Sequence, residues 1–328
     1  AFDQAEGPVI EGITEALRHS PSSDAEPILR SRLTAAKPCV RAIALEVLSF
    51  RRAALDAKQL ELLLLDNDPA VVVAAATAVG RLLIRSLASR VESLLGSDNS
   101  HVRHAAMRAG LLVGSEKALT RCRTAVMNKG EEASDALTLL SLAGKAEDIR
   151  LLVEALNQPQ AARCAVSALG WLGYASAVDA LIPLVADPTL SRLTAEAIAR
   201  VTGLNLEKDY LVATTPAPST PPAAADSKAQ ADDDDNFFED PDEGLPWPDP
   251  GRLMSWWKTN ATRFAATTRY RNGKPYSRQV LIDILHNGPL PDRHHAAYEL
   301  ALLHPSSSLL ETYAFADRQR RELAQLGA

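Results

Sequence analysis

Pro38-Cys39-Val40-Arg41-Ala42-Ile43-Ala44-Leu45 is the first of three related stretches in this sequence. Pro69-Ala70-Val71-Val72-Val73-Ala74-Ala75-Ala76 follows it after 31 residues, and Ser100-His101-Val102-Arg103-His104-Ala105-Ala106-Met107 follows after 31 more. Weaker copies start near residues 131, 159 and 189, and Pro8 precedes Pro38 by 30 residues. A fixed period of this length indicates a repeat architecture, which here runs from about residue 8 to about 203.

Each repeat reads as two short helices joined by a polar turn. Segments such as Ser86–Leu95 and Ala177–Val185 place apolar residues at the spacing of an amphipathic first helix. The second helix is rich in alanine, which lets neighbouring repeats approach closely. The residues expected to cap and open second helices are Asp66-Asn67-Asp68 with Pro69, Ser97-Asp98-Asn99, and Asp187 with Pro188. The glycines expected near helix ends, where they can take a left-handed cap, are Gly80, Gly110, Gly144, Gly170 and Gly203.

Two short patterns inside the repeats resemble HEAT repeats, particularly the short bacterial type also found in phycobilin lyases. One is Asp98 with Val102, Arg103 and Ala106, and the other is Ala168-Leu169-Gly170. Since one helix pair cannot bury its apolar stripe alone, stacked pairs share a core. The predicted fold class is therefore all-α, a HEAT-like α-solenoid of helical hairpins. Val72 and Ser134 stand where the repeat usually has Arg, so we expect any Asp–Arg ladder between turns to be incomplete.

The composition changes abruptly at Glu207. Residues 207–250 combine a Pro-rich run with an acidic block that starts at Asp232-Asp233-Asp234-Asp235 and continues through Glu243, giving a net charge of −10 in a chain of net charge −6. Such a block is not expected to pack. It acts either as a solvated tether or by docking on the basic C-terminal piece or a basic partner, and it lacks the spacing of an EF-hand calcium loop. We predict three parts: a repeat solenoid (1–206), a disordered acidic linker (207–250) and a C-terminal helical module (251–328).

The C-terminal module reads as four helices, at 252–264, 278–285, 292–303 and 308–326, with a turn at 271–275. The segment 292–301 resembles the second helix of one more repeat. Trp256-Trp257, residues 269–276, residues 293–305 and Arg318-Gln319 together resemble an uncharacterised proteobacterial family of HEAT-like proteins, often encoded near type VI secretion components. That resemblance implies no catalytic residue.

The sequence offers no constellation of catalytic or metal-binding residues. His101 and His104 share a helix face but lack a third ligand at metal spacing, and no His-Glu dipeptide occurs. Cys164, on an alanine-rich helix, is typical of a small buried side chain rather than a nucleophile. Phosphate-loop, dinucleotide and nucleophile-elbow motifs are absent from the sequence. We therefore predict no catalytic residue, no metal and no cofactor.

Arginines on the second helices are the candidate binding residues, because Arg pairs with carboxylates and stacks on aromatic rings. The alternative is that several of them form internal ladders with turn acids such as Asp68 and Asp98. Of Trp256 and Trp257, we expect one to be packed, because adjacent residues cannot both face inward on one helix. The candidates for a concave partner-binding face are Arg41, Arg81, Arg103, Arg108, Arg163, Trp171, Arg192 and Arg200.

A large groove without a catalytic site favours non-catalytic binding of a protein partner. The family resemblance implies an adaptor, chaperone or immunity-type role linked to type VI secretion. The alternative is a bilin-lyase-like enzyme that positions a pigment in the groove. The net charge of −1 over residues 1–206 argues against nucleic acid as a partner. Scattered cysteines and the lack of a long apolar run indicate a cytoplasmic protein that does not insert into membranes.

Overall fold

The computed structural model describes residues 8–20, 22–213, 240–304 and 308–326. Over these residues the protein is all-α, with 17 α-helices that pack as consecutive pairs and one hairpin of two-residue strands. The predicted fold class is confirmed as a helical-repeat fold. The contacts group the chain into two compact units, residues 1–144 with 277–328 and residues 145–276.

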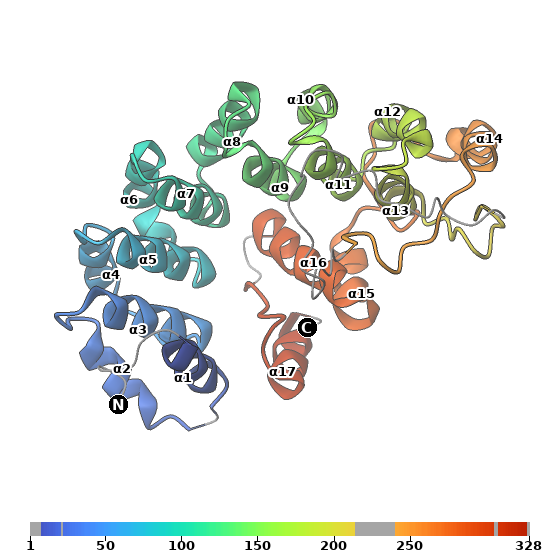
Figure 1. Ribbon diagram of the computed structural model, residues 1–328. Helices are drawn as coiled ribbons and strands as arrows, with labels where there is room; N and C mark the ends of the chain where they lie inside the picture. The colour runs from blue at the N-terminus through green and yellow to red at the C-terminus, as the bar shows by residue number, and fades with distance from the viewer. Residues whose placement is uncertain (1–7, 21, 214–239, 305–307, 327–328) are drawn as a thin grey trace, which may run out of the picture. The chain divides into compact units, whose positions relative to one another are not determined.

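The first unit stacks helix pairs of the repeat. Helices α3, α5 and α7 form an inner row in which each packs on the next, and α2, α4 and α6 lie outside them (Figure 1). The helices of the repeat part are α1 (Pro8–His19), α2 (Ala25–Arg32), α3 (Pro38–Phe50), α4 (Ala57–Leu63), α5 (Pro69–Arg81), α6 (Ala88–Ser93), α7 (Ser100–Val113), α8 (Glu116–Asn128) and α9 (Ala133–Ala143). Short 3₁₀ turns, η2 (Arg85–Leu87) and η3 (Leu94–Gly96), flank α6.

The predicted caps position the inner helices. Asp68 accepts a hydrogen bond from the Ala70 backbone N–H at 2.9 Å, and Pro69 opens α5. Asn99 caps α7 in the same way through the Val102 N–H. These bonds satisfy N–H groups that the first helical turn leaves without partners, so each inner helix starts at a fixed residue.

Three C-terminal helices complete the first unit: α15 (Arg278–Asn287), α16 (Leu290–Leu303) and α17 (Ala316–Leu326). Helix α16 packs on α7 and α9, and α15 packs on α16 and α17. The prediction of one helix over 308–326 is wrong at its start, because α17 begins only at Ala316. Residues 308–315 are not helical, and Leu309 and Leu310 within them are buried.

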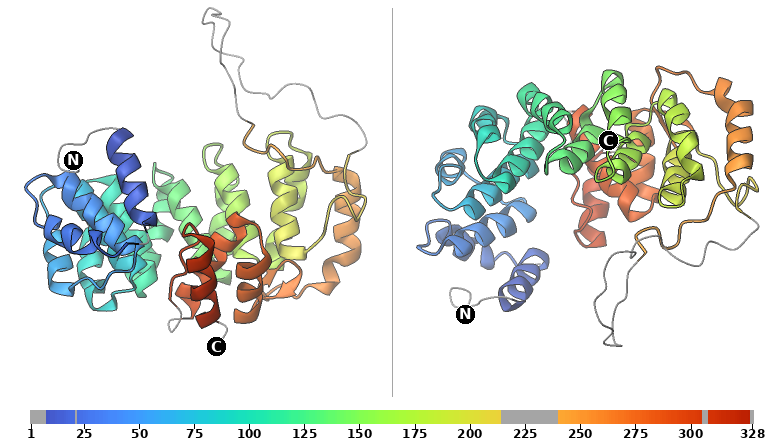
Figure 2. Two further views of the ribbon diagram at one scale, coloured as in Figure 1. Left: turned by 90° about the horizontal axis from the view of Figure 1, so that it is seen from below. Right: turned by 45° about the horizontal axis from the view of Figure 1, so that its top comes forward.

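The second unit holds two further repeat pairs and a helix that returns beside them. Helix α14 (Pro250–Asn260) lies beside α12 (Val178–Leu181) in Figures 1 and 2. The Trp257 indole N–H of α14 donates to Asp179 of α12 at 2.7 Å. Trp257 is buried and Trp256 half-buried, so the prediction that one of them packs is confirmed. The elements are η4 (Ala146–Asp148), α10 (Ile149–Ala155), α11 (Ala162–Leu172), η5 (Ala175–Ala177), α12 (Val178–Leu181), η6 (Ile182–Ala186), α13 (Ser191–Thr202), α14 (Pro250–Asn260), η7 (Ala261–Arg263), β1 (Tyr270–Arg271) and β2 (Lys274–Pro275).

The glycines serve two different purposes. Gly203 takes the left-handed cap of α13 as predicted, with φ at 72°. The expectation of such a cap is wrong for Gly80, Gly110 and Gly170, which lie inside helices where a neighbour comes close. A Cβ on Gly170 would stand 2.7 Å from the Cα of Ala197, so its missing side chain lets α11 and α13 touch. Gly144 ends α9 in an extended conformation.

The predicted acidic linker is only partly described. Residues 214–239, with Asp232–Asp235, lie outside the described residues. The prediction that the acidic block through Glu243 stays unpacked is wrong for Asp242, whose exposed fraction is 5%. The division at 206 and 250 stays a prediction, since the two compact units are a grouping by contacts. Asp187 and Pro188 were expected to cap and open the second helix of their repeat. That prediction is wrong in position, because α13 begins at Ser191.

Candidate protein-binding surface

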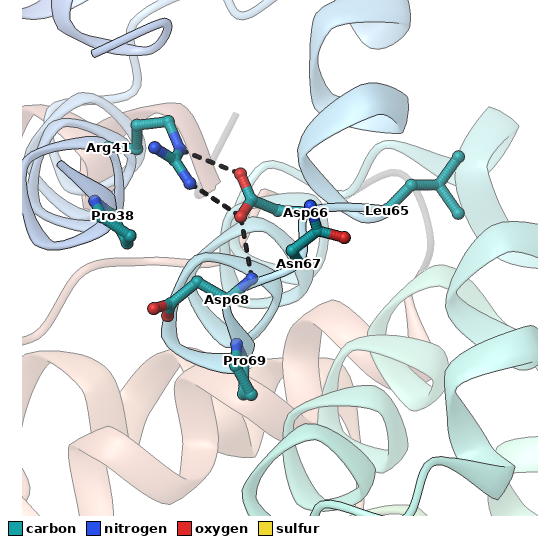
Figure 3. A pocket seen from close by; sticks show the side chains of 7 residues that line it. All are labelled: Pro38, Arg41, Leu65, Asp66, Asn67, Asp68 and Pro69. Atoms are coloured by element: carbon teal, nitrogen blue, oxygen red, sulfur yellow. Dashed lines mark hydrogen bonds and ion pairs between the residues drawn. The ribbon is translucent and has the colours of Figure 1, made fainter. Parts of the chain in front are cut away.

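Arg41 forms a rung between two successive turns of the repeat. Its guanidinium pairs with Asp66 through two bonds, of 2.9 and 2.8 Å (Figure 3). It also donates to the Ala35 and Ala36 carbonyls. The hydrogen bonds from Arg41 and from the Asp68 N–H lower the pKa of Asp66, although partial burial opposes them. The internal-ladder alternative therefore describes Arg41, with Asp66 as its acid rather than Asp68.

An open hollow of about 410 Å³ lies at this turn, lined by residues 38, 41 and 65–69. Its walls are the turn itself, and within them Arg41 pairs with Asp66 while Asp68 accepts from the Ala70 N–H (Figure 3). Nothing in this arrangement leaves Arg41 available to a ligand.

Arg103 repeats the arrangement two repeats later. It forms an ion pair with Glu132 and donates to the Ser97 and Asp98 carbonyls, at 2.7 and 2.9 Å. Arg121 shares the same Glu132 carboxylate. Asp98 accepts through its backbone carbonyl rather than its side chain. The acid that pairs with Arg103 is therefore Glu132 and not the predicted Asp98.

Arg163 and Arg192 take their acids from outside the repeats. Arg163 binds both carboxylate oxygens of Asp242, at 2.5 and 3.2 Å, and the Arg192 Nη2 lies 2.7 and 2.6 Å from the two oxygens of Asp240. Arg192 also donates to the Asp242 carbonyl at 2.9 Å, and its guanidinium stacks 4.7 Å from the Trp247 ring centre. These contacts fix one end of the acidic segment on the repeat.

Trp171 is half-buried in the second unit, and two guanidinium groups lie against its ring. Arg200 stacks 4.3 Å and Arg271 5.3 Å from its ring centre. Arg271, only 1% exposed, donates to the Trp171 carbonyl at 2.6 Å. Trp171 is thus neither a fully exposed side chain nor part of the buried core.

Arg271 belongs to a hairpin that crosses the ends of two helices. The Tyr270 N–H donates to the Gly173 carbonyl after α11, and the Asn272 N–H donates to the Arg200 carbonyl in α13, both at 2.7 Å. Sequence reasoning identified the turn at 271–275 but not its role as a bridge. The unusual Asn272-Gly273 pair, a strong hairpin signal, could have indicated it.

Arg81 and Arg108 line one hollow on the inner helices of the first unit. Arg81 donates to Ser49 Oγ at 3.1 Å and pairs with Glu311 at 3.3 Å. Arg108 is exposed and has no hydrogen bond or ion pair within the described part of the chain. The remaining lining residues are Thr77, Gly80, Ala105, Ala109, Leu112, Tyr298 and Leu309. Four of the predicted residues, Arg41, Arg81, Arg103 and Arg108, thus belong to the first unit and the other four to the second.

An aromatic cluster around Phe50 was missed by sequence reasoning. The guanidinium groups of Arg18, Arg81 and Arg318 lie 4.8, 5.7 and 5.3 Å from the centre of the Phe50 ring. Phe50 is 1% exposed, so these cation–π contacts are shielded from water. Arg318 is 268 residues away in the sequence, so no local pattern could have connected it with Phe50.

Two histidines near Arg108 have lowered pKa values. Burial lowers the pKa of His104 most, while its 2.9 Å neighbour Asp135 opposes and Arg108 adds to the effect. Burial likewise lowers the pKa of His294, whose Nδ1 lies 2.9 Å from Thr312 Oγ1. Burial therefore favours the neutral form of both imidazoles.

The described residues contain no cluster of three or more His, Cys, Asp or Glu side chains that could hold a metal ion. Among the helices of the same residues, none is long and apolar enough to cross a bilayer.

No protein-family model and no curated protein matches the sequence. Two crystal structures of engineered proteins from the Northeast Structural Genomics Consortium match in structure. One covers 55% of this chain and 96% of its own at 20% identity, and the other covers 99% and 80% at 15% identity, each with a TM-score of 0.37.

Proposed function

We propose that this protein is a non-catalytic scaffold that binds a partner protein on helices α5 and α7. The observation that carries the proposal is Arg108, an exposed cation beside the hollow at Arg81, with no ion pair in the described structure. The other predicted arginines already bind a carboxylate of this chain or stack on its aromatic rings. Arg108 differs from them in being available to a partner.

The surroundings of Arg108 indicate the chemistry of the partner. Ala105, Ala109, Leu112 and Leu309 give the hollow apolar walls, and Tyr298 adds an aromatic ring with a hydroxyl. Arginine and tyrosine beside apolar surface are typical of protein interfaces. A segment with an apolar side chain followed by a carboxylate would fill the hollow and pair with Arg108.

The finer identity is also a proposal. We propose that the repeats are HEAT-like of the short bacterial type, and that the protein acts in the cytoplasm as an adaptor, chaperone or immunity-type protein linked to type VI secretion. The support is the resemblance of the Asp98–Ala106 pattern and of the C-terminal segments described above.

The test is affinity capture from the native bacterium, comparing wild type with Arg108→Glu. The matched control is Arg150→Glu, because the Arg150 side chain is 90% exposed and belongs to the other unit. Arg103 and Arg163 are unsuitable, since their substitution would break rungs within the fold. We expect one stoichiometric protein to be captured by wild type and by the control, and to be lost with Arg108→Glu.

Two results would contradict the proposal. Capture that is equal for all three proteins would place the partner away from Arg108. Addition of a bilin that changes the absorption spectrum and forms a stable adduct, with no protein captured, would favour the lyase-type alternative.

A further inference from the structure

The arginine rungs of this protein differ in where their acids come from. Arg41 and Arg103 pair with acids 25 and 29 residues further along, at the next turns of the repeat. Arg163 and Arg192 pair with Asp242 and Asp240, which are 79 and 48 residues further along. At Arg163 and Arg192 the paired acid therefore comes from a separate segment and not from the next turn of the repeat.

The repeat does not supply these two acids itself. Asp187 occupies the turn position next to Arg163, but its Oδ1 accepts from the Thr189 N–H and hydroxyl, each at 2.8 Å. Arg163 reaches only the Thr189 carbonyl there, at 2.9 Å. Arg192 lies on α13, the last helix before residue 207, so no following repeat turn faces it.

The segment that completes the rungs is compact and acidic. The Asp242 N–H donates to Asp240 Oδ1 at 3.0 Å, which folds Asp240-Pro241-Asp242 into a tight turn with both carboxylates on the arginines. Arg192 and Arg163 lower the pKa of Asp240, as does this backbone bond. Beyond Gly244, which takes a φ of 82°, Trp247 stacks on Arg192.

We propose that Arg163 and Arg192 form a docking site for an acidic Asp-x-Asp segment of a partner protein, which residues 240–244 of this chain occupy in its absence. The site recognises two carboxylates two residues apart, because each guanidinium binds one of them. Arg163 does so as a fork of two nitrogens, and Arg192 does so through Nη2 while its Nη1 donates to the Asp242 carbonyl. Its specificity is for peptide carboxylates in a tight turn. This site is independent of the hollow at Arg108, which belongs to the other unit.

The test measures binding of a peptide in trans. The probe is a fluorescein-labelled peptide with the sequence of residues 240–249, and its control carries Asn in place of both aspartates at 240 and 242. Fluorescence anisotropy is measured with the full chain, as wild type and as the Asp240→Asn, Asp242→Asn double variant. We expect the double variant to bind the probe at least about tenfold more tightly than wild type, because its own segment has lost its charged hydrogen bonds.

Two controls tie the gain to the arginines. Adding Arg163→Gln to the double variant is expected to abolish the gain, and the control peptide is expected to bind no more tightly to the double variant than to wild type. Asp240→Asn alone is the second variant, because the Asp240 side chain is 43% exposed and its loss leaves the Asp242 contact in place. A gain of about threefold is expected for it.

The proposal is overturned if the probe binds wild type and variants equally, or binds none of them. Either result would mean that residues 240–244 only brace the fold. A gain that survives Arg163→Gln would place the peptide elsewhere on the protein and would also overturn it.

Discussion

Arg163 and Asp242, 79 residues apart in the sequence, form a two-pronged ion pair with N–O distances of 2.5 and 3.2 Å. The Asp242 side chain is 7% exposed and that of Arg163 40% exposed. A carboxylate so enclosed depends on its partner, because water cannot replace the lost hydrogen bonds. The acidic segment is thereby part of the packed second unit at this point.

Asp242→Asn is expected to lower the free energy of unfolding by about 1–2 kcal/mol, since a neutral amide is a poorer acceptor for two guanidinium N–H groups. Urea denaturation followed by circular dichroism measures the change. The control is Asp317→Asn, which removes an exposed ion pair with Arg320. This change should alter the free energy of unfolding by less than about 0.5 kcal/mol. Equal losses for the two variants would contradict the importance of the buried pair.

Gly170→Ala tests the close approach of α11 and α13. The added Cβ would lie 2.7 Å from Ala197, and we expect a loss of about 1–3 kcal/mol as the helices separate. Gly12→Ala is the matched control, because Gly12 is also helical but has nothing within 4 Å of a Cβ. Alanine there should stabilise the helix by about 0.5–1 kcal/mol. Thermal melts that show no difference between the variants would rule out the contact.

Trp257→Phe keeps an aromatic ring but removes the N–H that donates to Asp179 at 2.7 Å. The expected loss is about 1–2 kcal/mol, because the Asp179 oxygen loses its donor in a partly buried site. The neighbouring Trp256→Phe should cost less than about 1 kcal/mol, since Trp256 is half-buried. Chemical denaturation of both variants measures this difference, and a larger loss for Trp256→Phe would refute the assignment.

The pH dependence of stability should report on His294. Burial lowers its folded-state pKa below the ordinary 6.5, so the unfolded chain binds the proton more readily. Stability is therefore fully present above about pH 6.5 and falls as the pH drops towards the folded pKa. The carboxylates of Asp66 and Asp240 act below their ordinary 3.8, outside this range.

His294→Gln should flatten the dependence of the unfolding free energy between pH 7 and pH 5. Urea titrations at several pH values give the slope for each protein. His104 and His304 also have pKa values lowered by burial, so part of the slope should remain in the variant. A slope unchanged by the substitution would show that His294 does not contribute.

Local sequence patterns were sufficient for the repeats. The 31-residue spacing, the caps at Asp68 and Asn99 and the alanine-rich helices each depend on residues only a few positions apart, so their physical meaning can be read in one window. The helix pairs of the structure follow that pattern. The first helices are shorter than expected, because 3₁₀ turns replace part of Ser86–Leu95.

Long-range pairing could not be read in the same way. The charges of Asp240 and Asp242 suggested an unpacked block, because their partners are 48 and 79 residues away. Arg163 and Arg192 appeared available for the same reason. The sequence around Arg41, which pairs with an acid in the next turn, does not differ visibly from the sequence around Arg163, which pairs with a distant acid.

The hairpin of β1 and β2 has a mechanical consequence for the second unit. Its backbone is bonded to the Gly173 carbonyl after α11 and to the Arg200 and Val201 carbonyls in α13, while Arg271 holds the Trp171 carbonyl. Neighbouring helix pairs can normally shear past each other, since only side chains join them. Here, sliding α11 along α13 would stretch several hydrogen bonds at once. We therefore expect the hairpin to resist movement of these two helices relative to each other.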